Sequence, residues 1–394
     1  MDRRLIPLRP LSENKLRALG LEYFLGGDED WGYFAEAALT VTPAEVQAFH
    51  KAALEADKLL HAAADAAIQD GRWEELGIPH NAVQLIRHTW DDERHMHLLG
   101  RFDFAGGLDG VPLKLLEFNA DTCSILPETA IVQWEMLKDN GMDTADQFND
   151  LFDDLVDRFQ EVLRANPDME PTLLISTLGH PEDDLNAELV GDAAEEAGFQ
   201  EVQYLRLDRV VFSPDDGIFV EFGPNHYGRF DFWFKLIPWD FIAYEQPKLM
   251  NILTDIVLDR RAVILNPPHS MVFQSKALLK IAYQMFQKHE LLLPAFLKKP
   301  KKSTTPYVKK AYFGREGENV SIMDQYGHVL EKRSGDFGHY PNVFQSMASL
   351  NRDSEMYYYQ PGVYYCEEPC ALSFRRRDSL IIDEDAEFIP HLIR

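Results

Sequence analysis

The sequence predicts an α+β protein with more than one lobe. Its 394 residues can bury a large core, and 45% hydrophobic and 12% aromatic residues indicate a globular chain. Two local patterns indicate the fold class. Alternating polar and apolar residues flank a turn near residue 110, which predicts an antiparallel hairpin, and a strand–helix–strand unit over 172–206 predicts a parallel sheet.

Capping signals predict several helices in the first part of the chain. Thr42 can cap a helix that has a proline at its first position and Glu45 three residues after the cap, and this helix runs to about Gln69. Three further helices are expected, near 80–98, from Pro127 to about Gly141, and over about 145–165.

The predicted hairpin carries polar side chains on one face. Its turn is the glycine-rich run 105–112, and a register symmetric about that turn places Asp103 opposite Glu117. The same register places Arg101 opposite Asn119, and opposed residues lie about 5 Å apart. Two close carboxylates repel unless a cation lies between them. The hairpin therefore predicts a Mg²⁺ site with Asp103, Glu117 and Asn119 as ligands, and the alternative is a surface hairpin with ordinary acidic residues.

The strand–helix–strand unit predicts a small lobe of its own. A buried strand over 172–177, a helix that Gly198 ends and a second strand over 202–206 form a parallel pair with a right-handed crossover. We expect a Rossmann-like lobe over 145–235. It lacks a G-x-G-x-x-G motif, so it is not read as a dinucleotide site.

Charge and cysteine content limit the classes of partner. The net charge of −26 argues against nucleic-acid binding. An acidic surface suits a cationic substrate such as a polyamine, although solubility alone also explains it. No signal peptide and no membrane-spanning run is recognised, so no membrane association is expected. Three cysteines, Cys123, Cys366 and Cys370, form neither a disulfide framework nor a zinc motif, which favours a cytoplasmic location.

The hairpin motif resembles a known family of enzymes. R-x-D, a hairpin and then E-x-N resemble the metal-binding end of ATP-grasp ligases, and LLEFNADT followed by ILPETAIVQWEM looks like the glutathionylspermidine synthase family. The resemblance covers most of the chain. It implies a permuted ATP-grasp fold, in which the acidic hairpin precedes the nucleotide-binding lysines. Residues 1–144 and 236–394 would form the ATP-grasp synthetase region, and 145–235 the preATP-grasp lobe.

The resemblance also implies which residues bind ATP. Ser275 is expected to cap a helix that starts at Lys276, a lysine that reaches the nucleotide in the family. The strand-like run 306–310 matches the family at Lys309, but Lys310 stands where a proline is usual, so either lysine can face the nucleotide. A glycine-containing loop follows, and its backbone N–H groups can bind phosphate. The expected nucleotide contacts are Lys276, Lys309, Gly314, Arg315, Gly317, Gln345 on a strand over 343–345, and Arg375. Lys276 and Arg375 have an alternative as solvated side chains and Gln345 as part of an ordinary core strand, and the G-R-E-G loop alone is a weak signal.

The function implied by the resemblance is ATP-dependent carboxylate–amine ligation through an acyl phosphate, with ATP and Mg²⁺ as cofactors. Arg101 would be the catalytic residue, because it can stabilise the transferring phosphoryl group. A glutathione-like peptide and a polyamine are the expected substrates, and the chain is expected to be too short for the amidase domain of bifunctional relatives. Alternatives are a ligase for another peptide or amino acid and amine, or a non-catalytic nucleotide-binding protein. Asp121, Thr122 and Glu128 are expected to shape the substrate pocket.

Overall fold

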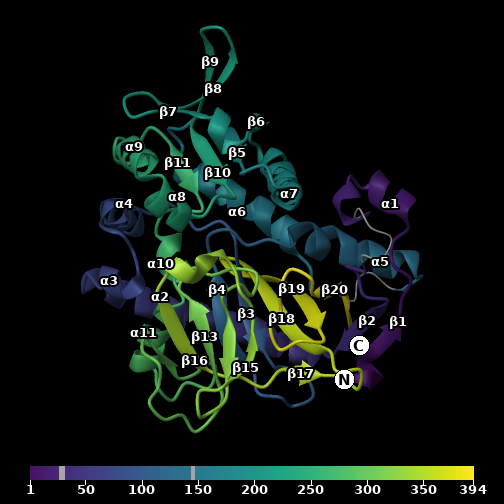
Figure 1. Ribbon diagram of the computed structural model, residues 1–394. Helices are drawn as coiled ribbons and strands as arrows, with labels where there is room; N and C mark the ends of the chain where they lie inside the picture. Colours follow the sequence, from purple (N-terminus) through teal and green to yellow (C-terminus); the bar gives the residue numbers. More distant parts are fainter. Residues whose placement is uncertain (26–31, 143–146) are drawn as a thin grey trace.

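The chain forms an upper part around a parallel sheet and a lower part around two antiparallel sheets (Figure 1). The computed structural model describes residues 1–25, 32–142 and 147–394. Both ends of the chain lie at the side of the lower part (Figure 1). There, β1 (Leu5–Pro7) and β21 (His391–Ile393) flank β2 (Ala37–Val41) in a small three-stranded sheet.

The upper part confirms the predicted parallel strand–helix–strand unit. Strands β5 (Thr172–Ser176) and β6 (Glu201–Tyr204) pair in parallel, and α7 (Pro181–Ala197) connects them. Two further parallel strands, β10 (Phe232–Lys235) and β11 (Val263–Leu265), complete the sheet in the order β11-β10-β5-β6. Because β11 lies after residue 235, this sheet includes a longer part of the chain than the range expected for the lobe. The expected boundary between residues 144 and 145 lies outside the described residues.

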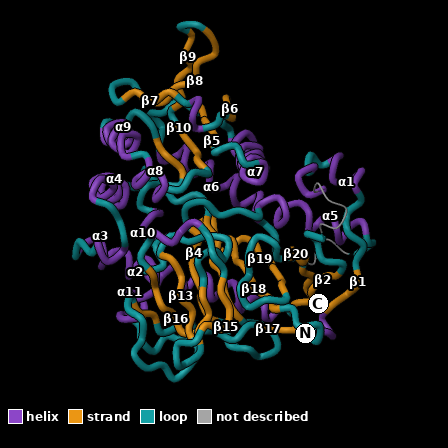
Figure 2. Tube along the Cα trace, viewed as in Figure 1, coloured by secondary structure: helices purple, strands orange, loops and turns teal. Residues whose placement is uncertain are grey.

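Helices cover the parallel sheet, and a small ribbon projects beyond it (Figure 2). Besides α7, the helices of this part include α6 (Leu151–Ala165), α8 (Trp239–Glu245) and α9 (Pro247–Leu258). The start predicted for α6, near residue 145, falls in the segment that is not described. The projecting antiparallel sheet consists of β7 (Val211–Ser213), β8 (Gly217–Gly223) and β9 (His226–Phe230).

The predicted polar hairpin is the edge of a six-stranded sheet. Strands β3 (Gly100–Ala105) and β4 (Lys114–Asn119) pair antiparallel, with Asp103 opposite Glu117 and Arg101 opposite Asn119, so the predicted register is confirmed. The opposite face is apolar: Phe102 and Phe118 stack with ring centroids 3.9 Å apart. The other strands are β17 (Asn351–Arg352), β18 (Tyr358–Cys366), β19 (Glu368–Arg377) and β20 (Glu387–Ile389).

The second antiparallel sheet contains both strands that the sequence predicts in the last hundred residues. They are β13 (Tyr307–Ala311) and β16 (Asn342–Ser346), which are direct neighbours, so that Val308 lies opposite Gln345. The sheet has the order β12-β16-β13-β14-β15. Its remaining strands are β12 (Ala295–Phe296), β14 (Ser321–Met323) and β15 (Val329–Lys332).

The capping box at Thr42 is present and begins the long helix α2 (Pro43–Gln69). The Thr42 side chain accepts a hydrogen bond from the Glu45 amide at 3.3 Å, and the Glu45 carboxylate accepts one from the Thr42 amide at 2.9 Å. The alanine-rich face of α2 is buried in the largest hydrophobic core, together with side chains from the six-stranded sheet. Thr42 therefore fixes the start of the helix that packs against the hairpin sheet.

Two helix predictions are corrected. The helix expected near 80–98 ends early, as α4 (His80–Asp91), because Asp92 adopts an extended conformation and the chain leaves toward β3. Ser275 does not begin a helix. It follows α10 (Ser270–Gln274), and its hydroxyl donates instead to the Leu76 carbonyl at 2.7 Å. The next helix is α11 (Leu278–Met285).

The remaining helices are short. The helix predicted from Pro127 is a wide π turn over Glu128–Val132 that continues as α5 (Gln133–Asp139). Across the described ranges, none of the helices combines the length and the apolar character needed to cross a lipid bilayer. The other two helices are α1 (Glu13–Ala18) and α3 (Trp73–Leu76).

Candidate active site

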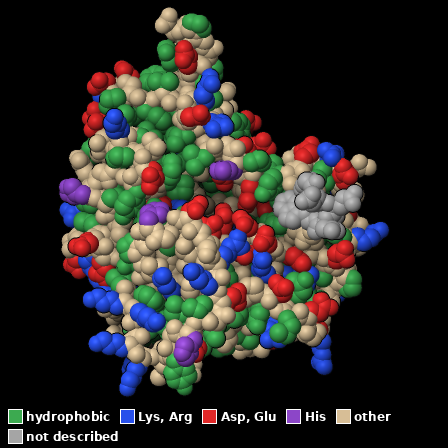
Figure 3. Space-filling view, viewed as in Figure 1, with side chains coloured by type: hydrophobic (Ala, Val, Ile, Leu, Met, Phe, Trp, Pro, Cys, Tyr) green, Lys and Arg blue, Asp and Glu red, His purple; other side chains and the backbone are tan. Residues whose placement is uncertain are grey.

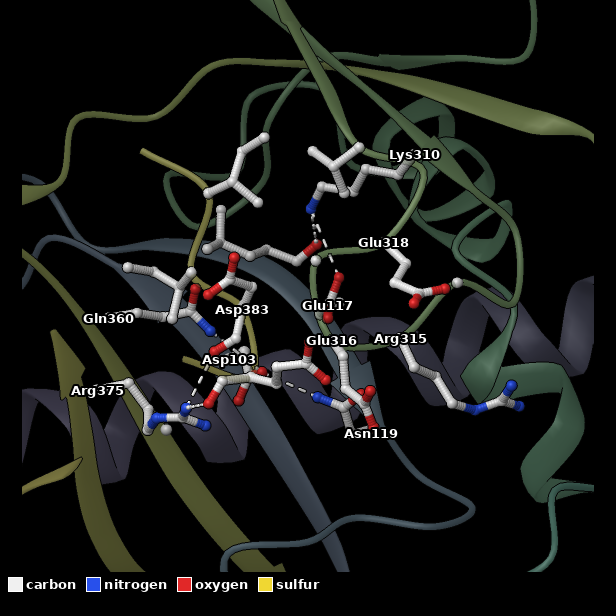
Figure 4. A pocket seen from close by; sticks show the side chains of 18 of the residues that line it. Asp103, Glu117, Asn119, Lys310, Arg315, Glu316, Glu318, Gln360, Arg375 and Asp383 are labelled. Atoms are coloured by element: carbon white, nitrogen blue, oxygen red, sulfur yellow. Dashed lines mark hydrogen bonds and ion pairs between the residues drawn. The ribbon is translucent and has the colours of Figure 1, made fainter. Parts of the chain in front are cut away.

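A cavity of about 430 Å³ lies between the two antiparallel sheets, and the polar face of the hairpin lines it (Figure 4). Strand β13, the loop 314–318 and the segment 380–385 form its other walls. These segments are far apart in the sequence and belong to two different sheets and the loops between their strands, and the cavity lies where they meet. Of the residues predicted from the sequence, the cavity lining includes Arg101, Asp103, Glu117, Asn119, Lys276, Gly314, Arg315, Gly317, Gln345 and Arg375.

Asp103 is held by a dense set of hydrogen-bond donors. Its carboxylate accepts from the Arg101 Nε at 2.6 Å and Nη2 at 3.0 Å, from the Asn119 amide at 2.9 Å and from the Gln360 amide at 3.3 Å. Burial alone would lower the pKa of Arg101, but the adjacent Asp103 charge raises it well above its ordinary value. Arg101 is therefore charged, and these donors hold the Asp103 carboxylate in place.

Glu117 faces two buried lysines. Its carboxylate lies 3.5 Å from the Lys276 Nζ and 3.6 Å from the Lys310 Nζ. Burial alone would raise the pKa of Glu117, but the charges of both lysines lower it below its usual value. Burial lowers the pKa of Lys310, and Glu117 opposes that shift. One carboxylate does not neutralise two ammonium groups, so the cluster attracts an additional anion.

The structure corrects the choice between the two adjacent lysines. Lys310 lines the cavity and approaches Glu117, as Figure 4 shows, whereas Lys309 is not part of the lining. Successive side chains on a strand point to opposite faces, so both lysines of β13 cannot face the same cavity. The residue that reaches the polar cluster is therefore Lys310, one position after the predicted Lys309.

The glycine-containing loop closes one side of the cavity. The Gly314 carbonyl accepts a hydrogen bond from the Lys276 Nζ at 2.7 Å. Gly317 has a φ of +69°, and a Cβ there would lie 2.9 Å from both Ile381 Cγ2 and the Ile382 carbonyl oxygen. Only glycine allows this close contact between the loop and the segment 380–385. The loop is thus fixed at both ends of its short turn.

Arg315 belongs to the loop that lines the cavity, and its side chain already has a partner outside the polar cluster. Its guanidinium pairs with Asp240 on α8, and it lies over the Phe337 ring at 5.4 Å. Figure 4 shows this side chain pointing away from Asp103 and Glu117. Arg315 therefore anchors the loop to α8, and it does not reach the metal end of the cavity.

Arg375 and Gln345 line the cavity but already have backbone partners. The Arg375 guanidinium donates to the carbonyls of Asp383 at 3.0 Å, Glu384 at 3.1 Å and Ala386 at 2.7 Å. The Gln345 amide donates to the Leu115 carbonyl at 3.3 Å. Arg375 thus holds the segment 380–385 in position, a contact that the sequence does not indicate.

Of the three residues expected to shape the pocket, Asp121, Thr122 and Glu128, only Thr122 lines the cavity. Asp121 lies outside the lining and is fully buried, with the Lys235 Nζ at 2.9 Å and the Trp239 amide at 2.6 Å. Glu128 is also buried and accepts a hydrogen bond at 2.5 Å from the hydroxyl of Tyr33, which lines the cavity. The latter two positions support the site without facing it.

An acidic wall, which sequence reasoning did not find, forms the mouth of the cavity. Burial raises the pKa of Glu316, and the neighbouring charges of Glu182, Glu384 and Glu318 raise it further. Figure 3 shows acidic side chains gathered at the hollow between the upper and lower parts. No local pattern could reveal this wall, because its residues come from α7, the loop 314–318 and the segment 380–385. The acidic wall consists of Glu182, Glu316, Glu318, Glu384 and Asp385.

The buried Glu128 gives a prediction about pH. Burial raises the pKa of Glu128 to about 7, and its Oε2 has no hydrogen-bond partner among the described residues. Between pH ~4.5 and ~7, Glu128 keeps its proton in the folded protein but has released it in the unfolded chain. The contribution of Glu128 to the free energy of unfolding is therefore complete below pH ~4.5 and is lost as the pH rises to ~7. We expect Glu128→Gln to raise the free energy of unfolding at pH 8, by up to about 3 kcal/mol, and to change it little at pH 4.5.

Urea unfolding at both pH values measures this difference. Glu135→Gln is the matched control, because Glu135 is also buried but is paired with Lys15 at 2.6 Å. Burial would raise the pKa of Glu135, but Lys15 lowers it, so loss of this charge should destabilise the protein at pH 8. A Glu128→Gln variant that is less stable than the parent at pH 8 would contradict the prediction.

The donor set of the hairpin fits a hard divalent cation. Asp103, Glu117 and Asn119 offer two carboxylates and an amide oxygen from adjacent strands. Oxygen ligands of this kind, few in number, are typical of Mg²⁺ sites that also bind phosphates. The two lysines stand beside these ligands, where a polyphosphate would lie.

Comparison with known proteins identifies the family of the chain. The model of the family described as "Glutathionylspermidine synthase preATP-grasp" matches residues 3–394. The chain belongs to the glutathionylspermidine synthase family. Membership places it among ATP-dependent C–N ligases.

Relatives within the family differ in length. A Haemophilus influenzae protein provisionally named an acid–amine ligase is 26% identical over 395 residues, covering 98% of this chain and 97% of that protein. The bifunctional glutathionylspermidine synthetase/amidase of Escherichia coli is 25% identical and matches 90% of this chain, but only 59% of its own length. The trypanothione synthetase of Crithidia fasciculata is 24% identical, and the match covers 84% of this chain and 52% of that protein. The chain thus spans somewhat more than half of these two longer relatives.

A solved structure shows the same fold at low sequence identity. The glutathione synthetase-like effector of Globodera pallida superposes with a TM-score of 0.54 at 10% identity, covering 92% of this chain and 90% of the effector. The mixed α/β architecture is therefore one that a glutathione synthetase-like protein also adopts.

Proposed function

We propose that this member of the glutathionylspermidine synthase family joins a carboxylic acid to an amine through an acyl phosphate, at the expense of ATP. The observation that carries the proposal is the pairing of an oxygen ligand set with buried lysines in one cavity. Asp103, Glu117 and Asn119 lie on the hairpin, and Lys276 and Lys310 lie within 3.6 Å of Glu117. Such a site can hold both a metal ion and the phosphates that the ion neutralises.

In the proposed reaction, a carboxylate oxygen of the acid attacks the γ-phosphorus of ATP, and ADP leaves. The amine nitrogen then attacks the acyl carbon, phosphate leaves, and the nitrogen loses a proton as the amide forms. Mg²⁺ held by the hairpin ligands would neutralise charge on the phosphates. Lys276 and Lys310 would bind phosphate oxygens, and Arg101 would face the transferring group. The loop 314–318 would keep water from the acyl phosphate.

The acidic wall supports a cationic amine as one substrate. Its carboxylates lie close enough to raise the pKa of Glu316, so a positive ligand placed among them would relieve their mutual repulsion. The names of two relatives include glutathionylspermidine and trypanothione synthesis. We therefore propose a polyamine as the amine and a glutathione-like peptide as the acid. The near full-length match to the acid–amine ligase favours, as a second candidate, another acid and amine joined by the same chemistry.

The proposal extends to the organisation and location of the protein. We propose a permuted ATP-grasp arrangement, in which 1–144 and 236–394 form the synthetase region and 145–235 the preATP-grasp lobe, whose sheet is completed by β11 from the second range. We also propose a cytoplasmic location. All three cysteines are free thiols and are buried, which suits a reducing compartment.

Phosphate release from Mg-ATP tests the function. Glutathione and spermidine are offered together, singly and not at all, and the products are weighed by mass spectrometry. We expect phosphate release and a conjugate mass only when both are present. Stimulation by neither would reject this substrate pair, and Mg-ATP binding without turnover on any acid and amine would favour the non-catalytic alternative.

A further inference from the structure

A cluster of metal-ligand side chains lies outside the ligase cavity, at the end of α4. His88 belongs to the last turn of that helix, Asp92 is its C-cap and His95 follows in the connection to β3. One ligand atom from each residue lies within 4.8 Å of the other two. Neither histidine lines the cavity described above.

Two ring nitrogens in this cluster have no hydrogen-bond partner. His95 is only 6% exposed, and its Nδ1 is buried without a partner among the described residues. The Nε2 of His88 is also buried without a partner among the described residues. The two imidazole rings lie edge to face, with centroids 5.8 Å apart. Buried polar atoms are nearly always paired, because leaving one unpaired costs about 1–3 kcal/mol. A bound cation would supply the missing partner for both nitrogens.

The remaining groups around the cluster leave room for a cation. The backbone amide of Arg94 donates to the Asp92 carboxylate at 3.0 Å, which holds that side chain beside the histidines. The Arg94 guanidinium turns toward Asp168, at 2.8 Å. The C-terminal end of a helix such as α4 also favours positive charge. The shallow hollow around the cluster is lined by three arginines and three acidic residues, among other side chains: Arg87, Arg94, Arg260, Asp91, Asp92 and Glu93.

We propose that His88, Asp92 and His95 bind one Zn²⁺ ion at a site separate from the ligase cavity. Two imidazoles and one carboxylate are a usual zinc ligand set, with a fourth position open to water or a small anion. Mg²⁺ prefers oxygen ligands alone, so the two sites are chemically distinct. Ligands about 2 Å from one ion lie roughly 3.3 Å apart in a tetrahedron. The separations between these ligand atoms, which are at most 4.8 Å, therefore need to shorten by no more than about 1.5 Å on binding.

The site fixes the approach to the catalytic strand. The connection that contains His95 continues through Leu98 and Leu99, whose amides both bond to the Asn266 side chain, and then enters β3. A metal ion that ties this connection to α4 limits its freedom before Arg101 and Asp103 follow on the strand. We infer a structural role for the ion, so its removal should lower the melting temperature of the protein.

Zinc binding to the full chain tests the proposal. The protein is stripped with a chelator, dialysed and titrated calorimetrically with Zn²⁺ in the presence of millimolar Mg²⁺. A parallel titration uses Glu117→Gln to remove zinc binding in the ligase cavity. We expect one Zn²⁺ per chain in both proteins, and at least a tenfold weaker affinity in Asp92→Asn and His95→Ala.

Controls separate metal binding from misfolding. His226→Ala, at an exposed position of the β8–β9 ribbon, should bind zinc like the parent. His88→Gln changes a half-buried side chain and keeps its size, so it tests the site even if His95→Ala fails to fold. Bound Co²⁺ should give the absorption of a tetrahedral site in the parent and lose it in His88→Gln. Unchanged zinc stoichiometry and affinity in Asp92→Asn and His88→Gln would overturn the proposal, as would the absence of any zinc bound by Glu117→Gln.

Discussion

Glu117→Gln is expected to reduce Mg-ATP turnover by a factor on the order of 10²–10³ while the protein remains folded. The substitution keeps the shape of the side chain but removes the carboxylate that faces Lys276 and Lys310. A neutral amide is a weaker ligand for Mg²⁺, and it leaves the two ammonium groups with less compensation. Lys276 keeps its hydrogen bond to the Gly314 carbonyl, so the local structure should survive. Steady-state phosphate release, with circular dichroism as a folding check, measures the effect.

The matched control is Glu221→Gln, the same change at an exposed position of β8 in the projecting ribbon. It removes one negative charge from the surface and should leave turnover within twofold of the parent. If Glu117→Gln retained full turnover at saturating Mg²⁺, the assignment of the hairpin as the metal site would be wrong. A loss in both variants would point to net charge and not to the hairpin.

Lys310→Met is expected to weaken Mg-ATP binding about 10-fold to 100-fold, and Lys309→Met less than threefold. A hydrogen bond to a charged group contributes about 1.5–3 kcal/mol, which corresponds to that range. Lys310 is 9% exposed and its Nζ lies beside Glu117, whereas Lys309 lies on the opposite face of β13. Methionine keeps the aliphatic length of both side chains and removes only the charge. Calorimetric titration with a non-hydrolysable ATP analogue gives the two affinities.

The adjacent pair is its own control, because both variants lose one positive charge from the same strand. A larger loss in Lys309→Met would return the nucleotide contact to the residue that the family pattern indicates. Equal losses of affinity in the two variants would mean that the loss of positive charge on β13 matters, whichever lysine is changed. Only the ranking with Lys310 first agrees with the cavity.

The register of the hairpin could be predicted because two independent signals agree. Alternation assigns Asp103 and Glu117 to one face, and symmetry about the turn predicts which of these residues are opposite, although the register shifts between Asp103 and Phe104 nearer the turn. At the run 306–310 the family pattern matches Lys309, but two lysines stand in succession, so the sequence leaves open which of them faces the nucleotide. On a strand, an error of one residue reverses the face, and only the pairing with β16 determines which lysine turns inward.

Other features depend on contacts between distant segments. Ser275 has the chemistry of a helix cap, but its hydroxyl bonds to the Leu76 carbonyl, almost two hundred residues earlier in the chain. Arg375 matches a family position, yet its partners are carbonyls of the segment that follows it. The acidic wall is assembled from three regions that share no motif. A single sequence identifies residue types, whereas these sites exist only after the chain has folded.

The bond from Lys276 to the Gly314 carbonyl links two events that are otherwise separate. One ammonium group lies beside the proposed phosphate position and also holds the backbone of the covering loop. Nucleotide binding at the proposed phosphate position and ordering of the loop are therefore coupled in free energy, and this coupling must be reciprocal. Whatever fixes the loop raises the affinity for nucleotide by the same factor by which nucleotide favours the fixed loop. In the proposed function, full closure of the loop would therefore follow the binding of the phosphate donor.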